Sequence, residues 1–187
     1  MPRHGGHADD CDLNQNGANV DVTVTLAVGE GFTNTGAGAA LTWDLAGEPV
    51  VSITNLDATK FSVSHDGTST GNLDGTGSWF YEIDCTATAC GSGGNHPYPG
   101  PLTFTIDNIS TADFISNGKT STGYKFASDI CTQIGTDGTC AGITGDVTAT
   151  FDSATLVSRQ PRMCPFPTIS ADRVIRHKAF SMPTYHG

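Results

Sequence analysis

The stretch of sequence that decides the fold is residues 20–28, which read VDVTVTLAV. Every second residue in it is a large aliphatic side chain, and the residues between them are Asp, Thr or Ala. Successive side chains of a β-strand point to opposite faces, so this period of two predicts a strand with one buried and one solvated face. We therefore expect this strand to pack onto a hydrophobic core.

Weaker copies of the same alternation recur along the chain and give about eight strands in all. Clusters of Gly, Asn and Asp separate them, as in residues 65–77 (HDGTSTGNLDGTG), where tight turns are favoured. We predict an all-β fold, a single jelly-roll-like antiparallel β-sandwich, because two facing sheets bury one face of every strand. The weaker copies lie at residues 41–45, 51–53, 61–63, 79–83, 102–106, 124–130 and 147–151.

Length and charge exclude several classes of protein. A chain of 187 residues suits one domain, and its 19 acidic and 9 basic residues give a net charge of −10. This charge opposes nonspecific binding to nucleic acid or anionic lipid, so we expect no nucleic-acid partner. No apolar run approaches the roughly 20 residues of a membrane-spanning helix, and the first residues lack a secretory signal, which we expect upstream.

Charge and composition change sharply near residue 158. Residues 1–157 contain 18 acidic and 4 basic residues, whereas residues 158–187 contain one acidic and five basic residues. The last segment is also poorer in Gly and Thr and richer in Pro. We predict a flexible, irregular N-terminal segment at residues 1–18, a β-sandwich domain at 19–157 and a basic, proline-containing tail at 158–187.

Four of the six cysteines are spaced as two local cross-links. Cys85 and Cys90 flank four residues after a predicted strand, and Cys131 and Cys140 flank eight residues that include a GTDG turn. Short loops have a high contact probability, and closing each one contributes roughly 2 to 3 kcal/mol. We predict two disulfides, which indicate an oxidising compartment and therefore an extracellular or cell-surface protein.

The spacing leaves alternatives open for the cysteines. Cys11 and Cys164 either bridge the two ends of the chain or remain thiols. A zinc site formed by Cys85, Cys90 and His96 competes with the first disulfide, although two cysteines separated by four residues, without a second close pair, are weak zinc spacing.

Six segments together resemble the ectodomain of PEP-CTERM sorting-signal proteins, over about residues 20–150. The resemblance implies export by Gram-negative, exopolysaccharide-producing bacteria, processing by an exosortase, and a place at the cell surface or in the biofilm matrix. It supplies no catalytic residues. The segments are residues 75–85 (GTGSWFYEIDC), 89–94 (ACGSGG), 99–106 (PGPLTFTI), 112–115 (ADFI), 126–130 (FASDI) and 142–147 (GITGDV).

The tail departs from the pattern of that family. Pro165-Phe166-Pro167 stands where a Pro-Glu-Pro motif is expected, and no apolar helix follows it. We interpret the last thirty residues as a frame-shifted or divergent end.

Enzymatic function is not expected from the residue pattern. His65 and His96 are the only histidines between residues 8 and 150, and neither lies in a recognisable nucleophile motif. Glu82 and Asp84 are two apart on one predicted strand face, a spacing that loosely fits the paired carboxylates of glycosidases. Such pairs arise by chance among 19 acidic residues, so we predict a protein that is not an enzyme.

Calcium is the one candidate cofactor, and none is required. Asp10, Asp12, Asn14 and Asn16 place oxygen ligands at alternate positions before Gly17, which imitates half of an EF-hand loop. The alternative interpretation is a solvated, turn-rich segment.

Three hypotheses remain for function. The first is a structural protein of the cell surface or extracellular matrix, associated with biofilm exopolysaccharide. The second is a carbohydrate-binding module, with Trp79, Tyr81 and Tyr98 as candidate rings for stacking on sugars. The third is a self-assembling filament or adhesion subunit, because the Thr-rich, Lys-poor strands carry few of the charges that block edge pairing. The expected partners are exopolysaccharide or copies of the chain itself.

Overall fold

The computed structural model describes residues 10–35, 39–73, 76–117 and 124–149. Within these residues it contains strands, one short α-helix and one 3-10 helix, labelled in chain order. The elements are β1 (Asp10–Asn16), β2 (Asn19–Thr25), β3 (Gly31–Phe32), β4 (Ala39–Leu45), β5 (Ile53–Thr54), β6 (Phe61–Leu73), β7 (Gly77–Cys85), α1 (Ala87–Cys90), β8 (Leu102–Ile106), η1 (Thr111–Asp113), β9 (Phe114–Ile115), β10 (Phe126–Cys131) and β11 (Thr144–Ala149).

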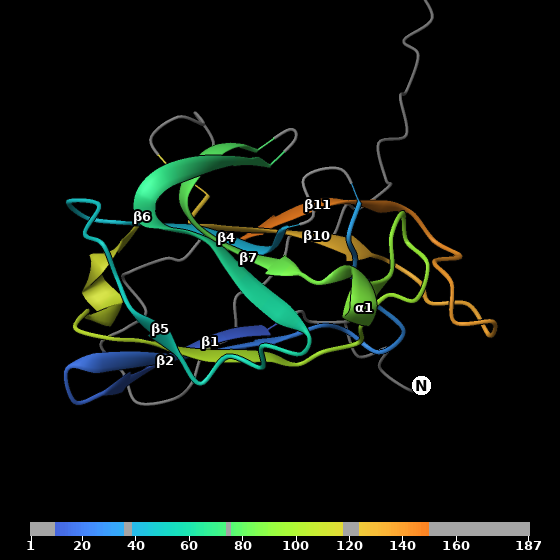
Figure 1. Ribbon diagram of the computed structural model, residues 1–187, viewed down its shortest axis with the longest axis horizontal. Coiled ribbons are helices and arrows are strands. Elements are labelled where there is room, and N and C mark those ends of the chain that lie inside the picture. The colour runs from blue at the N-terminus through green and yellow to red at the C-terminus, as the bar shows by residue number, and fades with distance from the viewer. Residues whose placement is uncertain (1–9, 36–38, 74–75, 118–123, 150–187) are drawn as a thin grey trace, which may run out of the picture.

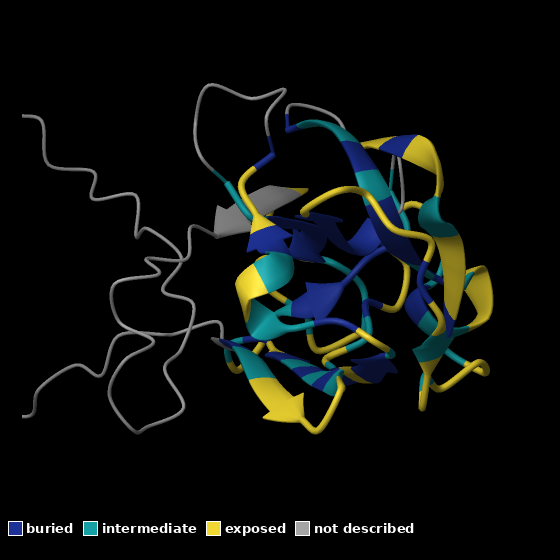
Figure 2. Ribbon diagram, turned by 90° about the vertical axis from the view of Figure 1, so that its left-hand side faces the viewer, coloured by how far each residue is buried: buried dark blue, intermediate teal, exposed yellow. Residues whose placement is uncertain are grey.

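The strands form two antiparallel sheets, which confirms the predicted all-β sandwich (Figure 1). The smaller sheet has the order β1-β2-β8-β5, and the larger has the order β11-β10-β4-β7-β6. The short strand β3 pairs with β10, and β9 pairs with β4. Buried residues lie between the two layers and exposed residues lie on the loops and outer strands (Figure 2).

Strand β2 follows the prediction made from its alternation. Val20, Val22 and Val24 are buried, whereas the residues between them are partly exposed. The strand lies between two neighbours, since Val22 pairs with Leu13 of β1 and with Phe104 of β8. It is therefore an interior strand of the smaller sheet.

The irregular segment predicted for residues 1–18 is wrong from Asp10 onward, because residues 10–16 form β1. A tight turn joins β1 to β2, with Asn16 paired to Asn19 and Gly17 at a φ of 63°. The two loop residues are Gly17 and Ala18, and a glycine at the first loop position suits a two-residue hairpin turn that needs positive φ there. Cys11 is also buried in the main core, at 2% exposure. Residues 1–9 and the predicted tail at 158–187 lie outside the described residues.

The described residues contain eleven strands, three of them only two residues long, against the eight or so predicted. Eight strands in the described part of the chain have five or more residues. The strand expected at residues 51–53 is reduced to the two-residue β5, and β1 takes its place in the count. The helical turn after Ser110 is present as η1, where the Ser110 hydroxyl accepts a hydrogen bond from Ala112 N at 3.2 Å.

An aromatic stack joins the two sheets. The ring of Trp43, on β4, lies 5.6 Å from the ring of Tyr81 on β7 and 5.4 Å from the ring of Phe104 on β8. Phe104 belongs to the smaller sheet, and the other two belong to the larger. Stacked rings at these distances add to the free energy gained by burying their area, so this stack fastens one sheet onto the other.

The larger sheet is also buried on the side away from the smaller one. Every residue of β4 is buried, although the alternation predicted one wet face. The described residues also contain a second apolar cluster beside the main core, formed by Ala39, Leu73, Trp79 and Ala127. The described residues contain no helix long and apolar enough to cross a membrane.

Replacing Trp43 by alanine tests the importance of the stack. Because the side chain is fully buried, Trp43→Ala should lower the free energy of unfolding by about 3 to 5 kcal/mol in urea denaturation followed by circular dichroism. Val28→Ala is the control, since Val28 is 94% exposed and its loss should change stability by less than about 0.5 kcal/mol. Equal losses in the two variants would contradict the assignment.

Candidate functional site

Two disulfides close the loops that the cysteine spacing predicted. Cys85, the last residue of β7, is joined to Cys90 at the end of α1, with 5.9 Å between their Cα atoms. Cys131, the last residue of β10, is joined to Cys140, with a Cα separation of 5.7 Å. The described residues contain no group of three or more His, Cys, Asp or Glu side chains suited to a metal ion, so the zinc alternative gains no support.

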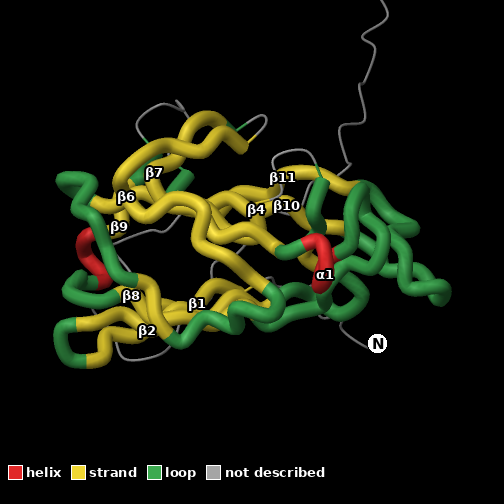
Figure 3. Tube along the Cα trace, in the orientation of Figure 1, coloured by secondary structure: helices red, strands yellow, loops and turns green. Residues whose placement is uncertain are grey.

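Both disulfides lie where long loops gather at one end of the sandwich, beside α1 (Figure 3). We call this region, residues 85–100 and 131–143, the disulfide end. Backbone hydrogen bonds connect its two loops, since Cys140 N donates to Gly94 O at 3.0 Å and Asn95 forms a bridge with Thr139. The loops are therefore fixed both covalently and by backbone pairing.

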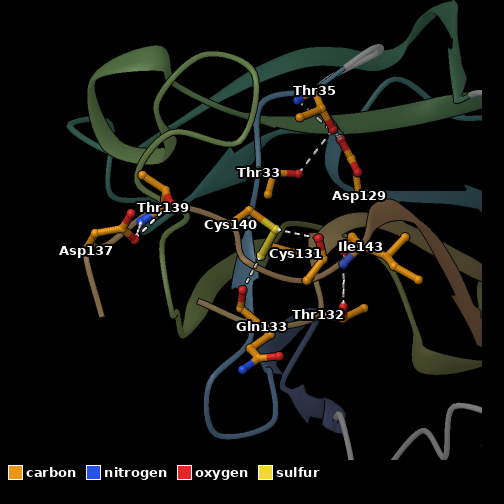
Figure 4. The surroundings of a disulfide bond; sticks show 11 residues. Thr33, Thr35, Asp129, Cys131, Thr132, Gln133, Asp137, Thr139, Cys140 and Ile143 are labelled. Carbon is orange, nitrogen blue, oxygen red and sulfur yellow. Dashed lines mark hydrogen bonds between the residues drawn. A yellow bond between two sulfur atoms is a disulfide. The ribbon is translucent and has the colours of Figure 1, made fainter. Parts of the chain in front are cut away.

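Acidic side chains around the second disulfide are held by threonines (Figure 4). Asp137 accepts hydrogen bonds from Thr139 N at 3.0 Å and Thr139 Oγ1 at 2.8 Å, and these bonds lower the pKa of the Asp137 carboxyl. Asp129 is buried, which raises its pKa, while Thr35 donates to it from both N and Oγ1. Both carboxyls are thus engaged in hydrogen bonds that shape the backbone.

Two of the three aromatic residues predicted to stack on sugars cannot do so, because they are fully buried. Trp79 lies in the second apolar cluster, and its Nε1 donates to Thr76 Oγ1 at 3.1 Å. Tyr81 lies in the main core, and its hydroxyl donates to Pro49 O at 2.5 Å. Alternation of apolar and polar residues shows which side chains share a face of the strand. It does not show whether that face is exposed to solvent.

Tyr98 is the third predicted ring, and it is only partly exposed. The Lys60 ammonium lies 4.6 Å from the centre of the ring and donates a hydrogen bond to the phenol oxygen at 2.9 Å. Lys60 is also paired with Asp57 at 3.4 Å, and the edge of Phe61 packs against the ring. The cation already makes the contact that a sugar face would need, so Tyr98 is a poor stacking platform as it stands.

The predicted calcium ligands are spread along an extended strand. Asp10, Asp12, Asn14 and Asn16 all belong to β1, where alternate residues are roughly 6 to 7 Å apart. A calcium ion needs its oxygen ligands at about 2.3 to 2.6 Å, so a straight strand cannot wrap four of them around one ion. Asn16 instead donates from Nδ2 to Asp21 Oδ2 at 3.0 Å. The strand geometry thus differs from a loop wrapped around an ion, and calcium binding by these residues stays a prediction.

A histidine on β6 joins a serine to a buried carboxyl, an arrangement that the sequence analysis missed. His65 Nδ1 lies 2.8 Å from Ser69 Oγ, and His65 Nε2 lies 3.9 Å from Glu82 Oε2. The order resembles a hydrolytic triad, in which an ionised carboxylate is hydrogen-bonded to the imidazole. Here the 3.9 Å separation exceeds a hydrogen bond.

The Glu82 carboxyl also lacks the negative charge that the carboxylate of a hydrolytic triad carries. Burial raises the pKa of Glu82 to about 8, and the neighbouring Asp84 carboxyl adds to the effect. At neutral pH the Glu82 carboxyl is therefore protonated and cannot act as the anion that orients His65. Glu82 and Asp84 lie two residues apart on the one strand β7, so they do not face one another from opposite walls of a cleft.

Comparison with known proteins gives no match, since no family model, no curated protein and no solved structure is significantly similar to this chain. The resemblance to PEP-CTERM ectodomains stays a prediction.

Removing the second disulfide should cost measurable stability. The double variant Cys131→Ala/Cys140→Ala should lose roughly 2 to 3 kcal/mol of unfolding free energy, because the loop of the unfolded chain is no longer closed. Reduction of the wild-type protein with dithiothreitol provides the matched comparison in urea denaturation. An unchanged midpoint in the double variant would show that this cross-link contributes nothing.

Proposed function

We propose that the protein is a non-enzymatic structural component of an extracellular or cell-surface matrix, in association with exopolysaccharide. The observation that carries this proposal is the pair of short-loop disulfides at one end of an all-β sandwich. Disulfides of this kind form and persist in oxidising compartments and are rare where glutathione keeps thiols reduced. The resemblance of residues 20–150 to exported matrix proteins points the same way.

A non-enzymatic role is supported by how the reactive side chains are used. Asp129 accepts hydrogen bonds from Thr35, and Asp137 accepts them from Thr139 within its own turn. Glu82 is buried, and its pKa is raised to about 8. The triad-like set on β6 lacks an ionised carboxylate within hydrogen-bonding distance of the imidazole.

Self-association through strand addition is the favoured mode of assembly. Strand β1 stands at the end of the smaller sheet, and its seven residues contain two Asp but no Lys, Arg or Pro. Charged residues, Lys above all, and Pro usually protect an edge strand from pairing with another chain, so only Asp10 and Asp12 protect this one. A second copy could extend the sheet there by backbone hydrogen bonds. Stacking on glycan is less favoured, because Trp79 and Tyr81 are buried.

The location of the protein tests the main proposal. Cells that produce it should carry it in the surface and matrix fractions, where added protease removes it without lysis, and a cytoplasmic marker should stay intact. Recovery of the protein in the cytoplasmic fraction would contradict an extracellular role.

A lysine on the edge strand tests self-association. Asn14 is exposed and pairs with Asp21 across the hairpin, so Asn14→Lys adds an edge charge that the hairpin itself tolerates. Sedimentation velocity at about 0.15 M salt, which partly screens the acidic surface, should show concentration-dependent assembly of the wild type and much less of Asn14→Lys. Ala58→Lys, on an exposed loop, is the control and should behave as wild type. A wild-type monomer at every concentration would rule out this mode.

A further inference from the structure

Two carboxyls on β7 occupy an unusual place for acidic side chains. Glu82 and Asp84 are two residues apart on one strand, and Glu82 is only 5% exposed. Glu82 pairs with Thr42 of β4 on one side and with His65 of β6 on the other. Asp84 pairs with Ala39 of β4 and Ser62 of β6. The backbone of both residues thus lies between the strands that flank β7, and we call their two side chains the carboxyl pair.

In the carboxyl pair, one oxygen of each carboxyl is buried without a hydrogen-bond donor. Glu82 Oε2 and Asp84 Oδ1 are both buried, and neither has a hydrogen-bond partner among the described residues. Buried carboxyl oxygens are normally satisfied by donors, and leaving them unsatisfied is costly, more so when they are charged. The two carboxyls interact directly, which raises the pKa of Glu82, and a proton held within the pair would supply the missing donor.

The local backbone makes room for the Glu82 carboxyl. A Cβ at Gly71 of β6 would overlap Glu82 Oε2 and come within 2.7 Å of His65 Cδ2. The pairing of β6 with β7 shifts in register between Asp66 and Gly71, so β6 bends over this part of β7, as Figure 1 shows. The carboxyl therefore fills the space where β6 crosses it.

The charged groups around the pair offer little compensation for a second negative charge. On β6 they are His65, whose Nε2 is 3.9 Å from Glu82 Oε2, and Asp66. On β4 the acidic residue is Asp44, whose Oδ1 accepts a hydrogen bond from Phe80 N at 2.9 Å. No lysine or arginine in the described part of the chain forms an ion pair with either carboxyl. Two adjacent anions here would repel each other in a poorly solvated site.

We propose that Glu82 and Asp84 share one proton at neutral pH, and that this proton is a latch that holds β6 against β7 and is released in alkaline solution. Protonated, the pair presents one negative charge and one O–H donor beneath β6. Deprotonated, it presents two negative charges there, and the β6–β7 pairing around Gly71 and His65 loosens.

The direction of the pH effect follows from the pKa of Glu82. Burial and the Asp84 carboxyl raise it from about 4.5 to about 8 in the folded protein, so the folded state holds a proton that the unfolded state has lost. Stability should therefore fall as the pH rises from about 4.5 through 8, and the contribution is gone above the folded pKa.

Thermal melting against pH tests the latch. The wild type should lose several degrees of melting temperature between pH 6 and pH 9, and Glu82→Gln, which keeps the shape without an ionisable proton, should lose much less over the same range. Glu48→Gln is the matched control, because Glu48 is exposed, and it should follow the wild type. An equal pH slope in Glu82→Gln and the wild type would overturn the proposal.

A spectroscopic titration of the wild type tests the same proposal without any variant. Carbon-13 NMR of the Glu82 side-chain carboxyl should show a midpoint near pH 8. Hydrogen exchange of amides in residues 61–73 should accelerate through the same range, while exchange in β2 should keep its intrinsic pH dependence. A Glu82 midpoint near the ordinary value of glutamate would show that no proton is shared.

Discussion

The structure depends on packing two sheets face to face around the aromatic rings of Trp43, Tyr81 and Phe104. These three rings stack on one another and come from both sheets. Other large buried side chains, among them Phe32, Phe61 and Leu45, surround them in the same core. The consequence for function is direct, because rings committed to the core are not available on the surface for a ligand.

The features left at the surface are backbone and loops rather than reactive groups. The disulfide end is fixed by two covalent links and by hydrogen bonds between loops. The second feature is the edge of the smaller sheet, where the seven residues of β1 carry backbone N–H and C=O groups on the side away from β2. A stiff body with a pairing edge suits a protein that is built into a matrix, and the acidic surface would make such pairing sensitive to salt.

Local signals made the sequence informative about parts of this fold. The alternation at residues 20–28 predicted β2, and the short spacings between cysteines predicted both disulfides, because each depends on neighbours in the chain. Strand β1 was missed, although Gly17 is a turn signal, because most residues of the strand are polar and imitate a calcium loop. Trp79 and Tyr81 were misjudged because alternation shows that two residues share a face of the strand but not whether that face is buried; both side chains are fully buried. The meeting of His65, Ser69 and Glu82 could not be predicted, since it depends on the shifted register of β6 and β7.

The central claim is that this is an oxidised scaffold working outside the cytoplasm. The most direct measurement is peptide mapping of the protein taken from its native cells, with thiols alkylated at the moment of lysis and no reductant added. The account predicts peptides linked through Cys85–Cys90 and through Cys131–Cys140. Recovery of those four cysteines as alkylated thiols would contradict it.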